Sequence, residues 1–404
     1  MSKWRKKQLQ EIAFLKPTET LKKGDIAPNI PMANIKEFQR DVVKIDYGEF
    51  RGGTKFRNGD TLLAKITPCL ENGKTAFVNC LQEDEIGFGS TEFIVLRAKE
   101  NIDERFLYYL SISPEFRKQA ISLMEGTSGR KRVNENALKI SDFLIPDFEE
   151  QKKIANILSA IDDKIFLNNQ INQELEAMAK TLYDYWFVQF DFPDQNGKPY
   201  KSSGGKMVYH PELKHEIPEG WGVEKLGDIA NITMGQSPKG TSYNEVGEGI
   251  LFFQGSTDFG WRFPVARQYT TEPSRIAEED DILLSVRAPV GTLNITDTRC
   301  CIGRGLAAIN SKVGANSYIF NVMQDFKKLF DMMNSVGTTF GSITKDDLYS
   351  LQLVYPPNEL LMKFDKSVNS FDREIKNRSR QNQELSQLRD WLLPMLMNGQ
   401  VKVI

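Results

Sequence analysis

Three side chains in one stretch of the sequence are of the types that metal-dependent hydrolysis uses. Pro193-Asp194 is followed by Glu212-Leu213-Lys214, which mimics the PD…ExK pattern of many nucleases. That chemistry needs an aspartate and a glutamate that converge on a divalent metal from adjacent strands. Here the residues lie in a connector rich in proline, glycine and serine, residues 191–221. A nuclease that uses Asp194, Glu212 and Lys214 is therefore an alternative that this setting disfavours.

Other catalytic arrangements need residues that the sequence lacks. The only histidines are His210 and His215, so a Ser-His-Asp or Cys-His arrangement is disfavoured. The glycine-rich cofactor loop and the Asn/Asp-Pro-Pro-aromatic site of an adenine methyltransferase are both missing. The cysteines have neither zinc-site nor disulfide spacing; they are Cys69, Cys80, Cys300 and Cys301. We therefore expect no catalytic residues and no metal site in this chain.

Loops that mix arginine and lysine with glycine, serine and threonine suggest DNA contact instead. Arginine can read guanine with two hydrogen bonds, and hydroxyls and backbone amides hold phosphates. Any one such loop is equally well explained as a solvated turn, but these loops recur at matching places in both halves of the chain. The candidate DNA-binding residues are Lys55, Arg57, Arg130, Lys131, Arg132, Arg287, Arg304, Thr338, Thr339 and Lys345. Because the net charge is −2, a DNA-binding surface must be local.

The elements that would position these loops occur twice. The quartet "NQEL" stands at residues 172–175 and again at residues 382–385. In the same register "AIDDKI" matches "SFDREI", and upstream "GDTLLAKITP" (residues 59–68) resembles "DDILLSVRAP" (residues 280–289). We interpret the chain as an internal duplication, with a mixed α/β domain followed by a long helix in each copy.

The two helices are predicted from apolar residues at spacings of three and four. The first runs from residue 148 to about residue 187 without internal proline or glycine, and the second to about residue 397. Pro394 predicts a kink or an early end in the second helix. Their apolar stripes are narrow, so we expect the helices to pack on each other. The expected interface residues are Leu158, Ile161, Ile165, Leu175, Met178, Leu182, Val368, Phe371, Ile375, Leu385, Leu388 and Leu392.

Polar residues interrupt both stripes near the middle. Asn168, Asn172 and Gln173 match Arg378, Asn382 and Gln383 in the repeat. Either a buried polar layer fixes the register of the two helices, or this part of each helix faces solvent. Both interpretations remain open from the sequence.

The helical segments carry a family resemblance. "LSAIDDKIFLNNQINQELEAMAKTLYDYWFVQFDFPDQNGKPYKSSGGKMVY" and "NQELSQLRDWLLPMLMNGQVKV" resemble the helical regions of specificity subunits of type I restriction–modification enzymes. The resemblance implies an α+β fold: two similar target-recognition domains joined by two long antiparallel helices, with a pseudo-twofold repeat. The expected ranges are residues 1–147 (first domain), 148–190 (central spacer helix), 191–355 (connector and second domain) and 356–404 (distal spacer helix).

The resemblance also implies function and partners. Each domain reads one half of a split site in double-stranded DNA, and the helices set the gap between the halves. Two methyltransferase subunits use S-adenosylmethionine to methylate adenine, and motor–nuclease restriction subunits use ATP and Mg²⁺; this chain binds no cofactor itself. No signal peptide or apolar span is found in the sequence, so we expect a cytoplasmic protein without membrane contact. A coiled-coil scaffold without a DNA role is the remaining alternative.

Overall fold

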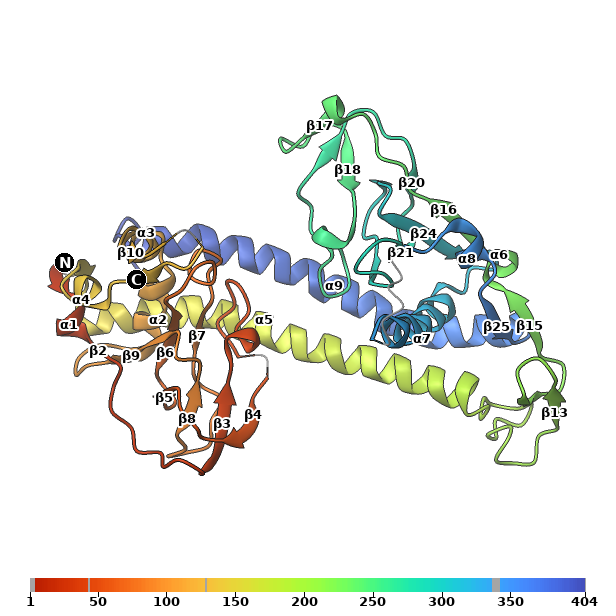
Figure 1. Ribbon diagram of the computed structural model, residues 1–404, viewed down its shortest axis with the longest axis horizontal. Coiled ribbons are helices and arrows are strands. Elements are labelled where there is room, and N and C mark those ends of the chain that lie inside the picture. The colour runs from red at the N-terminus through yellow and green to blue at the C-terminus, as the bar shows by residue number, and fades with distance from the viewer. Residues whose placement is uncertain (1–3, 43, 128, 336–341, 404) are drawn as a thin grey trace. The chain divides into compact units, whose positions relative to one another are not determined.

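A computed structural model describes residues 4–42, 44–127, 129–335 and 342–403. The chain forms two compact units. The first comprises Met1–Asn169 with Arg380–Ile404, and the second comprises Gln170–Ser379. Each unit holds one α/β domain and a part of both long helices. The labels of Figure 1 are used below.

The first unit contains two four-stranded sheets. Their strand orders are β2-β9-β6-β7 (the first sheet) and β4-β3-β8-β5 (the second sheet). Neighbouring strands are antiparallel except for the parallel pair β3 and β8. The strands are β2 (Ala13–Leu15), β3 (Ile26–Ile30), β4 (Asp46–Glu49), β5 (Thr54–Phe56), β6 (Thr61–Ala64), β7 (Thr75–Phe77), β8 (Gly87–Gly89) and β9 (Phe93–Ala98).

Helices complete the core of the first unit. The carboxylate of Asp103 caps α2 (Glu104–Ile112), accepting from the backbone N–H groups of Arg105 and Phe106. Strand β6 is buried along its whole length, as expected for an apolar strand covered on both faces. The remaining elements are β1 (Arg5–Gln8), α1 (Leu9–Ile12), α3 (Pro114–Ser122), β10 (Met124–Glu125), β11 (Arg132–Val133), α4 (Glu135–Lys139) and β12 (Asp142–Ile145).

The second unit repeats the first nearly strand for strand. Its first sheet has the order β16-β24-β21-β22, and its second sheet has the order β17-β19-β18-β23-β20, with the parallel pair β18 and β23. The duplication expected from the sequence is confirmed. The strands are β16 (Ala230–Met234), β17 (Tyr243–Asn244), β18 (Ile250–Phe253), β19 (Tyr269–Thr270), β20 (Ile276–Ala277), β21 (Ile282–Ser285), β22 (Leu293–Ile295), β23 (Cys300–Ile302) and β24 (Leu306–Ser311).

Helix α7 (Asn316–Ser335) follows β24 as α2 follows β9. The connector forms a small hairpin of β13 (Met207–His210) and β14 (His215–Pro218). The other elements of this unit are β15 (Gly222–Lys225), α6 (Leu226–Ile229), α8 (Lys345–Tyr349) and β25 (Gln352–Tyr355).

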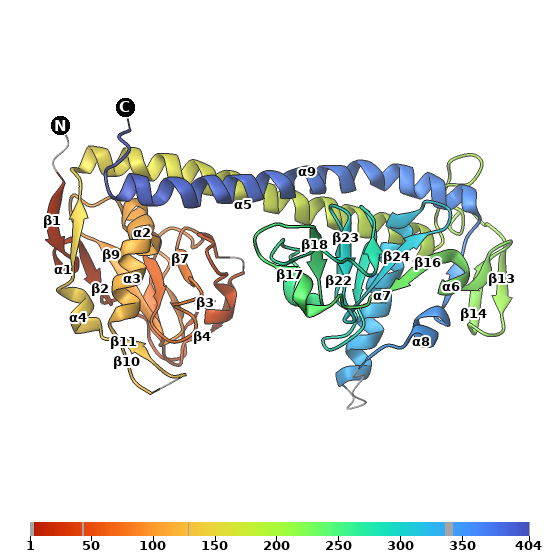
Figure 2. The same cartoon turned by 90° about the horizontal axis from the view of Figure 1, so that it is seen from above.

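The long helices are α5 (Phe148–Tyr183), which ends in a π-helical turn (Asp184–Val188), and α9 (Asn358–Met397). Helix α9 continues past Pro394, so of the kink or early end predicted there, the early end does not occur. In each unit a part of α5 lies beside a part of α9 (Figure 2), and residue numbers rise along one helix as they fall along the other. The two helices are therefore antiparallel within each unit. None of the helices in the described ranges is long and apolar enough to cross a membrane.

Candidate nucleic-acid interface

The hairpin of β10 and β11 presents the basic loop of the first unit. Arg130 and Lys131 are exposed between the two strands. At the base of the hairpin, Arg132 donates two hydrogen bonds to the carboxylate of Glu92, at 2.9 and 2.7 Å. The Arg132 hydrogen bonds lower the pKa of Glu92. The ion pair of Arg132 with Glu92 therefore fixes one end of the loop that carries Arg130 and Lys131.

Two other candidates of the first unit differ from this pattern. The ammonium group of Lys55 donates to the backbone oxygens of Glu19 and Leu21, at 3.0 and 3.1 Å. Lys55 is partly buried and makes this contact within the domain, and its contact with DNA stays a prediction. Arg57 is exposed, and its Nε lies 3.9 Å from a carboxylate oxygen of Glu19.

The described candidates of the second unit, Arg287, Arg304 and Lys345, are exposed. Arg287 follows β21, and Arg304 lies in the turn between β23 and β24. Lys345 begins α8, and its ammonium nitrogen lies 5.0 Å from the ring centroid of Tyr349. Thr338 and Thr339 fall outside the described residues.

A backbone bridge joins equivalent segments in both units. Ile66 bridges Arg132 in the first unit, and Arg287 bridges Ser342 in the second. Ile66 and Arg287 occupy the same position of the two aligned stretches that end in Pro68 and Pro289. In the first domain the segment after β6 therefore meets the segment before α4. In the second domain the segment after β21 meets the segment before α8 in the same way.

The nuclease pattern does not converge. The carboxylate of Asp194 accepts the backbone N–H groups of Asn196 and Lys198, at 2.7 and 2.8 Å, within its own loop. Glu212 and Lys214 are exposed in the turn between β13 and β14. Within the part of the chain that the structure describes, no group of three or more His, Cys, Asp or Glu side chains could hold a metal ion. The nuclease alternative is thus not supported.

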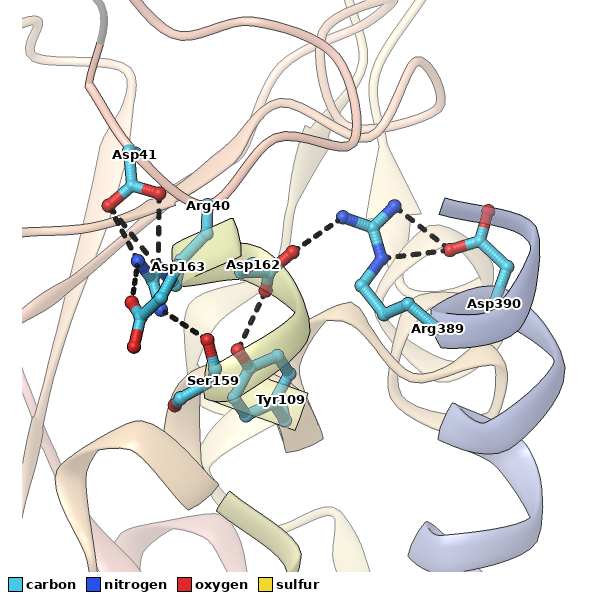
Figure 3. A network of polar contacts seen from close by, with 8 residues as sticks. All are labelled: Arg40, Asp41, Tyr109, Ser159, Asp162, Asp163, Arg389 and Asp390. Atoms are coloured by element: carbon cyan, nitrogen blue, oxygen red, sulfur yellow. Dashed lines mark hydrogen bonds and ion pairs between the residues drawn. The ribbon is translucent and has the colours of Figure 1, made fainter. Parts of the chain in front are cut away.

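A buried polar network, which the sequence did not reveal, joins the first domain to α5 and α9 (Figure 3). Asp162 of α5 accepts hydrogen bonds from the hydroxyl of Tyr109 on α2, at 2.7 Å, and from Nη1 of Arg389 on α9, at 2.9 Å. Asp162 is 3% exposed, and burial raises its pKa although Arg389 opposes that shift. One carboxylate thus ties together the domain and both helices of the first unit.

A second arginine of this network comes from a loop of the domain. Arg40 donates from Nη2 to Asp163 of α5 at 2.7 Å and from Nη1 to the backbone oxygen of Ser159 at 3.4 Å. Asp41 also accepts from its guanidinium, at 3.0 to 3.2 Å. Although Arg40 is only 6% exposed, its carboxylate partners compensate its charge.

The second unit also has a buried arginine that contacts the long helices, Arg262. Its guanidinium contacts Asp372 of α9 and Glu176 of α5, the latter at 3.3 Å, and lies over the ring of Phe320 at 4.6 Å. Burial raises the pKa of Glu176, and Arg262 opposes that shift. Asp372 matches Asp162 in the helical repeat. The retained aspartate was the signal from which a buried cation could have been inferred.

The polar middle of the helices is a buried layer. In the first unit Asn168 is fully buried and donates to Gln381 and Asn382 at 2.8 and 2.9 Å. In the second unit Asn172, also buried, donates to Ser379 at 3.4 Å. Gln173 and Gln383 are exposed. Asn168 and Asn172 therefore form the buried layer, Arg378 and Asn382 are half-buried, and the two glutamines face solvent.

Most of the expected helix-interface residues are buried or half-buried. Met178 and Leu388 are corrections, since their side chains are 52% and 43% exposed. The next residue on each helix, Ala179 and Arg389, is buried instead. The fully or nearly buried members are Leu158, Ile161, Val368 and Ile375, and the half-buried members are Ile165, Leu175, Leu182, Phe371, Leu385 and Leu392.

Comparison with known proteins gives a consistent result. The family model described as "Type I restriction modification DNA specificity domain" matches residues 1–177 and 218–387. A protein of Methanocaldococcus jannaschii, named for the MjaX specificity subunit of a type I restriction enzyme, is 30% identical over 387 residues. That match covers 93% of this chain and 87% of the relative. The HindI specificity subunit of Haemophilus influenzae is 24% identical over 85% of this chain and 87% of its own length.

A solved structure shares the fold. The S subunit of a type I restriction–modification system from M. genitalium matches with a TM-score of 0.60 and 17% identity. The match covers 98% of this chain and 96% of that chain. The family model matches most of the sequence, and the fold agrees with it. This chain therefore belongs to the type I restriction–modification DNA specificity family.

Proposed function

We propose that the chain is a non-catalytic specificity subunit that reads a split target in double-stranded DNA. The observation that carries this proposal is the strand-for-strand repetition of one α/β domain, with an exposed arginine in the backbone bridge that both copies share, Arg132 in the first unit and Arg287 in the second. Two similar domains on antiparallel helices suit two short sequence elements separated by a fixed gap. Base contacts in each half supply about 1–3 kcal/mol of discrimination per good pair.

Catalysis is assigned to partner subunits. Methyltransferase subunits supply S-adenosylmethionine and methylate adenine, and restriction subunits supply ATP- and Mg²⁺-dependent translocation and cleavage. This chain binds none of these cofactors in the proposal. A type I restriction–modification enzyme acts on DNA inside the cell, so we assign the chain to the cytoplasm.

Two methyltransferase subunits are proposed because two equivalent apolar positions are open. Met178 of α5 and Leu388 of α9 occupy the same position of the helical repeat, and both are about half exposed. A single exposed apolar side chain is common on protein surfaces, so it is the equivalence of the two positions in the repeat, and not exposure alone, that favours a docking role. Leu388 lies in the first unit and Met178 in the second, so each unit offers one position to one methyltransferase subunit.

Mapping of methylated adenines tests the proposed function directly. A genome that carries this chain with its methyltransferase partner is sequenced for N6-methyladenine and compared with a genome that lacks this chain alone. We expect methylation at one bipartite motif with a fixed gap, lost when the chain is deleted. Methylation at an uninterrupted motif, or methylation independent of this chain, contradicts the proposal.

A further inference from the structure

The two sheets of each domain are attached to the long helices in different ways. The apolar core around the first sheet includes helix residues: Ile154 and Leu158 of α5 in the first unit, and Phe364 and Val368 of α9 in the second. The apolar cores between the sheets, around Phe56 in the first unit and Leu283 in the second, contain no α5 or α9 residue in the described part of the chain. Apolar packing therefore holds the first sheet on the helices but leaves the second sheet to other contacts.

Arg40 and Arg262 supply those contacts from equivalent places. Arg40 lies in the connection between β3 and β4, and Arg262 lies in the matching connection between β18 and β19. The backbone oxygen of each arginine accepts the N–H of the last residue of a matching strand. That residue is Phe77 of β7, at 2.9 Å, or Ile295 of β22, at 2.8 Å.

The side chains of both arginines point to helix carboxylates. Arg40 reaches Asp163 of α5, and Arg262 reaches Glu176 of α5 and Asp372 of α9. These arginines are 6% and 5% exposed, so they have little open surface with which to contact DNA. A buried guanidinium is stable only with its carboxylates in the right geometry, because its desolvation is otherwise uncompensated. The contact therefore favours one orientation of the second sheet on the helices.

We propose that Arg40 and Arg262 are positioning residues that fix the second sheet of each domain on the helices and so determine which gap between half-sites the protein accepts. This inference rests on the proposed function. One added base pair turns a half-site by about 35° and moves it by about 3.4 Å along the DNA axis. A domain held rigidly rejects such a change, whereas a domain whose second sheet can tilt tolerates it.

The test uses the chain assembled with its methyltransferase subunits and duplexes that carry both mapped half-sites. The gap in these duplexes is the preferred one, or it is one or two base pairs shorter or longer. We expect the unaltered complex to prefer its gap by about tenfold over a change of one base pair. Arg40→Met and Arg262→Met should each reduce that preference to about threefold, while base preference within the half-sites stays unchanged. Arg40→Lys should restore part of the gap preference, since it keeps the charge.

Two further variants keep the test decisive where an Arg→Met chain fails to fold. Asp163→Asn removes the helix carboxylate that pairs with Arg40. Because Asp163 is 66% exposed, this variant should fold, and it should broaden the accepted gaps. Arg299→Met is the control, because Arg299 forms an exposed ion pair with Glu278 at 3.2 Å, and it should change nothing.

Three outcomes overturn the inference. One is an unchanged gap profile in Asp163→Asn and both Arg→Met variants. Another is an equal loss of affinity at all gaps, which indicates a purely structural role. The third is altered base preference, which indicates direct reading. Failure of the unaltered complex to prefer any gap refutes the proposed function instead, so the two failures are distinguishable.

Discussion

Arg389 of α9 and Asp162 of α5 form an ion pair in which both side chains are nearly excluded from water. Nη1 of Arg389 donates to Oδ1 of Asp162 at 2.9 Å, and the two residues are 5% and 3% exposed. Tyr109 brings α2 of the first domain into the same contact through its hydroxyl group. The pair therefore couples the helix–helix contact of the first unit to the domain that rests on it.

Removal of one partner should cost far more than removal of both. Arg389→Met leaves Asp162 buried without a cation and should lower the free energy of unfolding by about 3–5 kcal/mol. The double variant Asp162→Asn with Arg389→Met should recover most of that loss, since no charge remains uncompensated. Urea denaturation of the four chains of this double-mutant cycle measures the coupling. Additive losses would show that the pair has no coupling energy.

The stability of the single variant Arg389→Met should also depend on pH. Burial already raises the pKa of Asp162, and loss of Arg389 removes an interaction that lowers it. The folded protein then holds a proton that the unfolded chain has released, so the stability of Arg389→Met should fall as pH rises from the unfolded pKa of Asp162 through its raised folded pKa. Urea midpoints across that range, with Asp162→Asn/Arg389→Met as the control, should show this fall only in the single variant.

The hydrogen bonds of the buried asparagine layer should stabilise the contact between the two helices. Asn168→Leu leaves Gln381 and Asn382 without one of their partners and should destabilise the protein by about 1–3 kcal/mol. Gln173→Leu is the matched control on the exposed face of α5 and should change stability by less than about 0.5 kcal/mol. Equal urea midpoints for the two variants would contradict a buried layer.

Basic residues of the two units should affect different halves of the target. Arg130→Ala should weaken binding through the half-site of the first domain, and Arg287→Ala through that of the second. If the arginine reads a base, the loss of binding free energy should be about 1–3 kcal/mol. If it holds a phosphate, the affinity should depend less steeply on salt concentration. Competition with duplexes altered in one half-site separates the two. Loss at both half-sites from one substitution would assign that residue a structural role.

Met178 and Leu388 should each support one methyltransferase subunit. Met178→Glu or Leu388→Glu places a charge at the proposed docking position and should reduce the complex from two partner copies to one. Both substitutions together should abolish binding. Native mass spectrometry counts the copies. The control is Val246→Glu, at an 81% exposed apolar residue in the loop between β17 and β18. Two bound copies in the double variant would exclude these positions as docking sites.

Much of the fold followed from periodicity. Apolar spacings of three and four predicted α5 and α9 to within a few residues, because local hydrogen bonding and one apolar stripe are enough to specify a long helix. The matching of "AIDDKI" to "SFDREI" predicted the duplication that the two sheet orders confirm. The exposed basic loops were also visible in the sequence, although their contacts with DNA stay predictions.

The sequence by itself determined the two long helices and the repetition of one domain. Only the tertiary structure decided which polar residues are buried. Arg40 and Arg262 lie in irregular loops, where burial has no periodic signal and depends on carboxylates of helices distant in sequence. At positions 388 and 389 the apolar pattern even pointed to the wrong residue. The buried carboxylate of Asp162 requires a cation, so Arg389 takes the buried position and Leu388 faces solvent.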